Sequence, residues 1–163
     1  MERTITLRDQ LTAGLVAGIA GGLLIALFVF ALELAAGMPP YALWMNFAVV
    51  TAALLGPRIG GNPSLLPLGV VLHFCVAIGW ALGYAHLACT QPHLVTRPWV
   101  SGAGFGIVVY VFMMIVLISA GSYHRPMPLV LGAQLVAHSA FYGIPVALIV
   151  ARMLRPHAGA GPA

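Results

Sequence analysis

Polar and charged residues gather near the two ends of the chain and in short interruptions, and the stretches between them are almost wholly apolar. Four apolar stretches are long enough to cross about 30 Å of hydrocarbon, which takes roughly 20 residues of helix at 1.5 Å per residue. They run over residues 11–36, 65–85, 100–120 and 129–151. The pattern therefore predicts an all-α, polytopic membrane protein with four transmembrane helices.

A further apolar segment, residues 42–56, lies between the first and second of these helices. Because it is too short to cross the bilayer, we expect a re-entrant or interfacial segment there. The last residues, 156–163, are rich in Gly, Ala and Pro, which predicts a disordered tail. The expected organisation is a single four-helix transmembrane domain over residues 1–155.

The two halves of the chain resemble each other. Five residues of the first half match residues found 84 positions later, and these are Gly18, Gly22, Phe28, Ala36 and Gly37. Three more match at an offset of 65, and these are Pro63, Val71 and His73, paired with Pro128, Val136 and His138. The matches predict two repeated hairpins, with the segment 42–56 inserted in the first one.

Charge is scarce and follows a membrane rule. Only 6% of the residues are charged and 61% are hydrophobic, which lies outside the range of soluble domains. The arginines form no cluster that would follow a phosphate backbone, so we expect no nucleic-acid partner. On a four-span topology, five arginines fall on one side and two, Arg58 and Arg125, on the other. This bias predicts cytoplasmic N- and C-termini in a bacterial-type inner membrane.

Small residues recur at four-residue spacing within the predicted helices. Because lipid is as apolar as leucine, membrane helices associate through close backbone contact, which small residues permit. We therefore expect helix packing at Gly14, Gly18, Gly22, Gly79, Gly83, Gly102 and Gly106.

His73 and His138 are the strongest candidates for chemistry. An ionisable side chain near the centre of a bilayer is costly and marks a functional site by default. Each histidine follows a proline by ten positions, so both are expected roughly 15 Å into the membrane, at one depth. Tyr142 lies one turn after His138 on the same helix face, and Tyr110 is a second neighbour by depth.

Several ligands suit this histidine pair. Two imidazoles at one depth suit a bis-histidine haem b, a metal ion, a quinone or a proton relay. Copper gains some support from methionines expected near the outer side, since thioethers and imidazoles suit Cu(I). The structural alternative is that each histidine is neutral and hydrogen-bonded to a hydroxyl or a backbone carbonyl.

Glu33 is the only acidic residue inside a predicted span. It is expected about one turn from the outer end of the first helix. The two interpretations are an interfacial ion pair with Arg58 or Arg125 and a proton-accepting site.

The paired segments LHFCVAIGWALGYA (72–85) and VAHSAFYGIPVAL (136–148) resemble helices two and four of small uncharacterised bacterial inner-membrane proteins. In those proteins a membrane histidine is followed within a few residues by glycines. The resemblance implies a four-helix plasma-membrane protein and brings no activity with it.

The short loops hold no separate catalytic domain, and the chain has no GxSxG, HExxH or Walker-type motif, so we expect no enzyme. The sequence favours a non-enzymatic accessory or scaffold subunit that associates with other membrane subunits or with itself as a homo-oligomer. The first alternative is a redox or ligand-binding protein centred on His73 and His138. The second is a small proton-coupled transporter that uses Glu33.

Overall fold

The computed structural model of the chain describes residues 5–39, 42–56, 62–121 and 128–155. These residues form helices joined by short turns, and none of them belongs to a β-strand. Four helices are long and apolar enough to cross a membrane: Leu7–Ala35, Leu66–Thr90, Pro98–Ser119 and Leu129–Leu154. The prediction of an all-α chain with four helices able to span a membrane is confirmed for these residues.

Polar groups at its two ends set the bounds of α1 (Leu7–Ala35). The Asp9 N–H donates to Thr6 Oγ1 at 3.2 Å, and the Thr6 N–H donates back to Asp9 Oδ2 at 2.9 Å. This capping box starts the helix earlier than the apolar pattern alone predicts. At the other end Gly37 adopts a φ of 75° and its N–H donates to Leu34 O, a termination that favours glycine.

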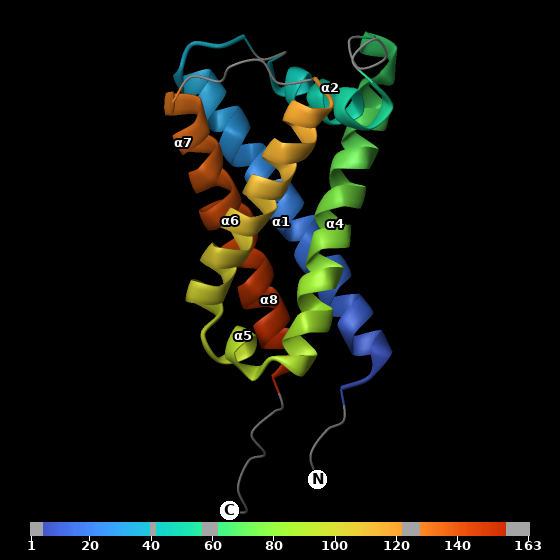
Figure 1. Ribbon diagram of the computed structural model, residues 1–163, viewed down its shortest axis with the longest axis vertical. Coiled ribbons are helices and arrows are strands. Elements are labelled where there is room, and N and C mark those ends of the chain that lie inside the picture. The colour runs from blue at the N-terminus through green and yellow to red at the C-terminus, as the bar shows by residue number, and fades with distance from the viewer. Residues whose placement is uncertain (1–4, 40–41, 57–61, 122–127, 156–163) are drawn as a thin grey trace, which may run out of the picture.

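The short helix α2 (Ala42–Leu55) lies across the end of the bundle where α1 ends and α4 begins (Figure 1). Its 14 residues span about 21 Å, less than the hydrocarbon thickness. It packs on α4 at Gly69, where an added Cβ would lie 2.5 Å from Phe47 O and 2.7 Å from Thr51 Oγ1. The absence of a side chain at Gly69 therefore lets α2 dock directly on α4.

The second and third spans are joined at the opposite end of the bundle. The elements in chain order are the 3₁₀ turn η1 (Pro63–Leu65), α4 (Leu66–Thr90), α5 (Pro92–Thr96) and α6 (Pro98–Ser119). The buried Tyr84 hydroxyl lies 3.2 Å from Leu94 O and 3.1 Å from Ser101 Oγ. These contacts tie the connecting helix α5 to both spans.

The fourth span is interrupted near its middle. It consists of α7 (Pro128–Val136), the π-helical segment η2 (Ala137–Gly143) and α8 (Ile144–Leu154). The Ile144 N–H donates to Ser139 O, five residues back, directly before Pro145, which has no N–H to donate. Widened turns of this kind occur frequently at functional sites, and this one contains His138.

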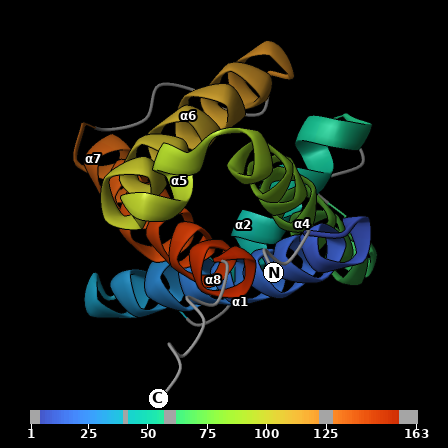
Figure 2. The same cartoon turned by 90° about the horizontal axis from the view of Figure 1, so that it is seen from below.

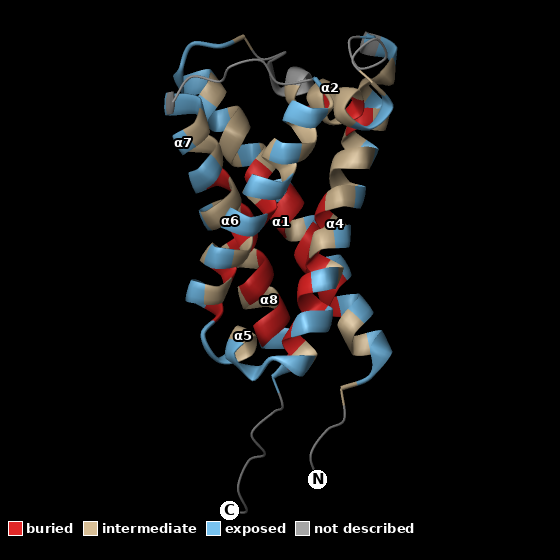
Figure 3. Cartoon of the chain, viewed as in Figure 1, coloured by how far each residue is buried: buried red, intermediate tan, exposed pale blue. Residues whose placement is uncertain are grey.

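The helices pack most tightly in one half of the bundle. Helix α1 packs on both α4 and α8, and α6 packs on α8 and η2 (Figure 2). Buried residues gather in the half that carries α5 and α8, whereas the half that carries α2 is largely intermediate or exposed (Figure 3). The dense half is built largely from alanines, including Ala13, Ala17 and Ala81, which are 0% exposed.

Glycines bring the backbones of neighbouring spans together. A Cβ added to Gly18 would lie 2.5 Å from Ile78 Cα, and one added to Gly106 would lie 2.6 Å from Ser139 Cα. The other close glycines are Gly14 against Leu82, Gly22 against Ala77, and Gly102 against Ile144. Such contacts give van der Waals packing in place of a hydrophobic driving force.

Gly79 and Gly83 behave differently from the other glycines. Both are exposed, and an added Cβ would meet nothing within 4 Å among the residues that the structure describes. The packing expected at these two positions is therefore not found within the described chain.

Two glycines of α6 provide a matched test of this packing. We expect Gly106→Ala to lower the free energy of unfolding by about 1–3 kcal/mol, because its methyl group would overlap the η2 backbone. Gly104→Ala should be neutral or stabilising, since an added Cβ there meets no described atom within 4 Å and alanine is the better helix former. Reversible denaturation of both variants in detergent micelles measures the difference. Equal stability of the two variants would contradict the packing.

Candidate functional site

A cavity of about 380 Å³ lies between the helices in the half of the bundle that carries α2. Its wall is mostly apolar, but six helical segments each contribute one polar side chain. In the order α1, α2, α4, α6, α7 and η2, these are Glu33, Asn46, His73, Tyr110, Gln134 and His138. The structure therefore brings the two membrane histidines to one cavity, together with Glu33, the acidic residue near the C-terminal end of α1.

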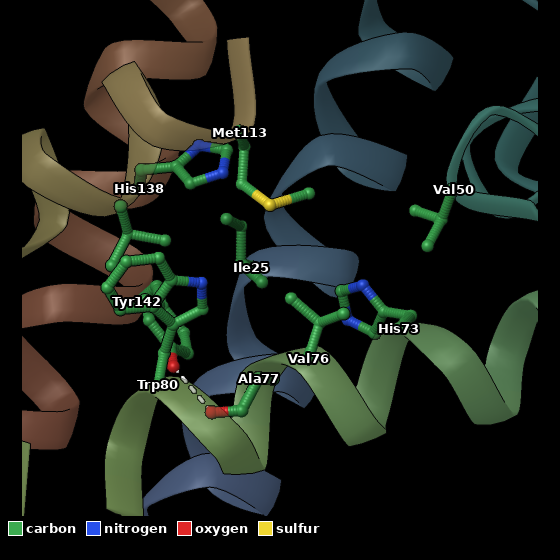
Figure 4. A pocket seen from close by; sticks show the side chains of 10 residues that line it. Ile25, Val50, His73, Val76, Ala77, Trp80, Met113, His138 and Tyr142 are labelled. Atoms are coloured by element: carbon green, nitrogen blue, oxygen red, sulfur yellow. Dashed lines mark hydrogen bonds between the residues drawn. The ribbon is translucent and has the colours of Figure 1, made fainter. Parts of the chain in front are cut away.

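A smaller cavity of about 60 Å³ adjoins it and is also lined by both histidines. Figure 4 shows the imidazoles of His73 and His138 on opposite sides of this space, with Met113 and Ile25 between them. The two rings therefore face a shared volume and do not contact each other directly.

His73 is held by the backbone of α1. Its Nε2 lies 3.0 Å from Gly22 O, and the rings of Phe47 and Phe74 pack edge-on against it. Because a carbonyl oxygen only accepts hydrogen bonds, Nε2 carries the proton. In the neutral imidazole, Nδ1 then has the free lone pair.

His138 has the opposite arrangement. Its Nδ1 lies 2.8 Å from Gln134 O in the preceding turn, so Nδ1 carries the proton and Nε2 has the lone pair. The Tyr110 ring packs beside it at a centroid distance of 5.5 Å. Each histidine thus satisfies one nitrogen with a backbone carbonyl and keeps one acceptor nitrogen.

Tyr142 stabilises the site, although its hydroxyl contacts neither histidine. Its ring is 3% exposed, and the hydroxyl donates to Ala77 O of α4 at 2.6 Å. This hydrogen bond joins α4 to η2 within four residues of His73 on one side and of His138 on the other. Its role in the described structure is to fix the spacing of the two helices that carry the histidines.

Glu33 is paired with a residue of α2. Asn46 Nδ2 donates to Glu33 Oε1 at 2.7 Å, and the buried Oε2 has no hydrogen-bond partner among the described residues. The expected ion pairs with Arg58 or Arg125 fall outside the described residues. Asn46 was not singled out by sequence reasoning, although it is the only amide within the apolar segment 42–56.

A metal centre finds limited support. No group of three or more His, Cys, Asp or Glu side chains that would hold an ion occurs within residues 5–39, 42–56, 62–121 and 128–155. Met113 and Met114 line the larger cavity, whereas Met38 is exposed. Cys75 is exposed as well and lines neither of these two cavities.

No protein-family model, no curated protein and no solved structure matches the chain. The chemistry of the cavity therefore has to be argued from the residues that line it.

The Tyr142 hydrogen bond can be tested by removing its hydroxyl. Tyr142→Phe should lower the free energy of unfolding by about 0.5–1.5 kcal/mol, because Ala77 O loses a buried partner. Tyr110→Phe is the control, since the Tyr110 hydroxyl has no hydrogen-bond partner within the described structure. Chemical denaturation in detergent compares the two. A Tyr142→Phe variant as stable as the control would show that the bond contributes nothing.

Proposed function

We propose that the protein is a membrane protein that binds a small, largely apolar molecule bearing hydroxyl groups in the cavity between His73 and His138. The observation that carries this proposal is the convergence of polar side chains from six helical segments on one otherwise apolar cavity. Its volume of about 380 Å³ falls in the range of small-molecule sites, roughly 300–1,000 Å³. Polar groups are costly in a membrane and are retained where they serve a site.

The protonation of the histidines selects the ligand chemistry. Two polar atoms around the cavity, His73 Nδ1 and His138 Nε2, have no hydrogen-bond partner among the described residues and are acceptors when the imidazoles are neutral. Glu33 Oε2 is a third acceptor when the carboxylate is ionised. A ligand that satisfies them must donate hydrogen bonds, as hydroxyl groups do. A quinol has two such hydroxyls on a flat apolar ring and represents this class.

Haem b and copper are the competing ligands of the same histidine pair. Backbone carbonyls that fix the imidazole tautomer are typical of metal-bound histidines too. We rank both below the hydroxylated ligand because Glu33, Asn46 and Gln134 extend the polar wall beyond the two histidines. Neither metal nor haem accounts for these additional polar side chains.

The cavity also changes the order of the functional hypotheses. The sequence alone favours an accessory or scaffold subunit, for which short loops are the main argument. A wall of converging polar side chains favours the ligand-binding alternative, because a purely structural bundle gains nothing from such a cavity. We retain a bacterial-type inner membrane with cytoplasmic termini, and with α2 as an interfacial or re-entrant helix on the outer face, as part of the proposal.

We further propose that the four spans are two copies of one hairpin. Contacts between spans support this, since they obey the offsets found in the sequence. Gly22 lies against Phe74, and Gly106, 84 positions after Gly22, lies against Ser139, 65 positions after Phe74. The pair Gly18 and Ile78 corresponds in the same way to Gly102 and Gly143. Gly37 and Gly121, also 84 apart, both end their helices with a positive φ, 75° and 68°.

Binding of a quinol tests the proposed function. In nanodiscs kept under argon, we expect decylhydroquinone to bind the wild type, and His73→Phe or His138→Phe to raise Kd about five- to tenfold by removing one acceptor. His93→Phe is the control, because His93 is exposed in α5 and lines neither of the two cavities. The dimethyl ether of decylhydroquinone has no hydroxyl group and cannot donate a hydrogen bond. The wild type should bind this ether no more tightly than the histidine variants bind decylhydroquinone.

Two results would overturn this function. The first is a wild-type protein that binds the quinol no better than empty nanodiscs do. The second is a haem absorption band or stoichiometric copper in the purified wild type that both histidine variants lose.

Proton-coupled transport is a second candidate, favoured by Glu33 Oε2, which has no hydrogen-bond partner among the described residues. A carboxyl group in this position can exchange a proton with a ligand that occupies the cavity. We then expect a pH gradient to drive uptake of the quinol probe into proteoliposomes and Glu33→Gln to abolish the dependence on the gradient. Gradient-driven uptake that persists in Glu33→Gln would exclude Glu33 as the coupling group.

A further inference from the structure

The two seams that would be equivalent in a repeated hairpin differ. The seam between α1 and the fourth span (η2 and α8) is closed. A Cβ added to Gly21 would lie 2.9 Å from both Tyr142 and Val146, and the rings of Phe28 and Phe141 stack at 3.9 Å. The small residue at position 21 allows α1 to approach the fourth span this closely.

The other seam lies between α4 and α6. Phe105 occupies the α6 position that corresponds to Gly21 at the offset of 84. Its ring lies 4.8 Å from the Tyr84 ring and 6.2 Å from the Trp80 ring, centroid to centroid, and Phe112 lies 5.1 Å from Trp80. Aromatic rings therefore lie between α4 and α6. In the corresponding seam, between α1 and the fourth span, the helices pack directly on Gly21.

An apolar cavity of about 470 Å³ lies on this seam, between α2, α4 and α6. Every residue of its lining is apolar, including Val76, Gly79, Trp80 and Phe112. Gly79 is exposed and Phe112 is 50% exposed, so the cavity reaches the outer surface of the bundle. Because these residues lie within the spans, the surface that it reaches faces lipid.

The seam cavity adjoins the histidine cavities. Val76 and Trp80 line both it and the 60 Å³ cavity that contains His73 and His138. Val50 and Met113 line all three cavities. These four residues therefore border both the lipid-facing seam and the cavities that contain the histidines, and Met113 has a flexible side chain.

We propose that the α4–α6 seam is a lateral entrance from the membrane and the binding site for the apolar tail of the ligand. The occupant is an amphiphile whose hydroxylated head group lies between His73 and His138 and whose hydrocarbon tail lies along Val76, Gly79 and Phe112. This inference rests on the proposed function and adds to it the class of ligand and its route. A membrane-dissolved ligand reaches the cavity without passing through water.

A pair of glycines on α4 tests the entrance. Gly79→Phe places a ring in the seam cavity, and Gly83→Phe places the same ring one turn away, outside it. At neither position does an atom of the described residues lie within 4 Å of an added Cβ, so both variants are expected to fold. Decylhydroquinone and methylhydroquinone, which share the head group, are compared in nanodiscs at fixed lipid concentration.

We expect Gly79→Phe to raise Kd for decylhydroquinone about tenfold or more, since the tail loses its apolar site, and to leave Kd for methylhydroquinone unchanged. Gly83→Phe should leave both unchanged. If Gly79→Phe binds decylhydroquinone as tightly as the wild type does, or weakens the binding of both probes equally, the proposed entrance is wrong. The proposed function survives that result as long as His73→Phe weakens both probes. A wild type that binds neither probe overturns both proposals.

Discussion

Close backbone contact between spans is the constraint on which this structure depends. Lipid offers helices no hydrophobic reason to associate, so packing has to come from surfaces that approach without side chains between them. Gly18 and Gly22 hold α1 on α4, and Gly102 and Gly106 hold α6 on the fourth span. These contacts join the helices in the half that carries α5 and α8, and the cavity lies between the helices in the half that carries α2.

The polar groups of that cavity are satisfied only in part, and the remaining capacity defines what the site can bind. A buried polar group without a partner costs free energy in any apolar medium. His73 and His138 each use one nitrogen on a backbone carbonyl, which leaves the second as an acceptor. Glu33 likewise uses one carboxylate oxygen on Asn46 and leaves the other without a described partner. A ligand that donates hydrogen bonds offsets these costs together, which links the chemistry of the site to its position in the membrane.

Hydropathy was enough to predict the four spans, and the shared distance from Pro63 and Pro128 predicted that the histidines lie at one depth. Hydropathy was not enough to tell which face of each helix contacts lipid, since both faces are apolar. Gly79 therefore looked like a packing residue and turned out to be exposed. The π-helical turn in the fourth span lies directly before Pro145, which has no N–H to donate, and hydropathy gives no sign of it. Asn46 was overlooked because a single amide in a short apolar segment gives no periodic signal.

The central claim is that the cavity between the histidines holds one small amphiphilic molecule, and native mass spectrometry of the protein released from its own membrane tests it most directly. The account predicts that the wild type carries a single adduct of defined mass that is not a phospholipid. This adduct should be lost on collisional activation and missing from the His73→Phe, His138→Phe double variant. Its fragments should reveal a hydroxylated head group and a hydrocarbon tail. A wild-type protein that carries no such adduct, or carries the same one as the double variant, would contradict the account.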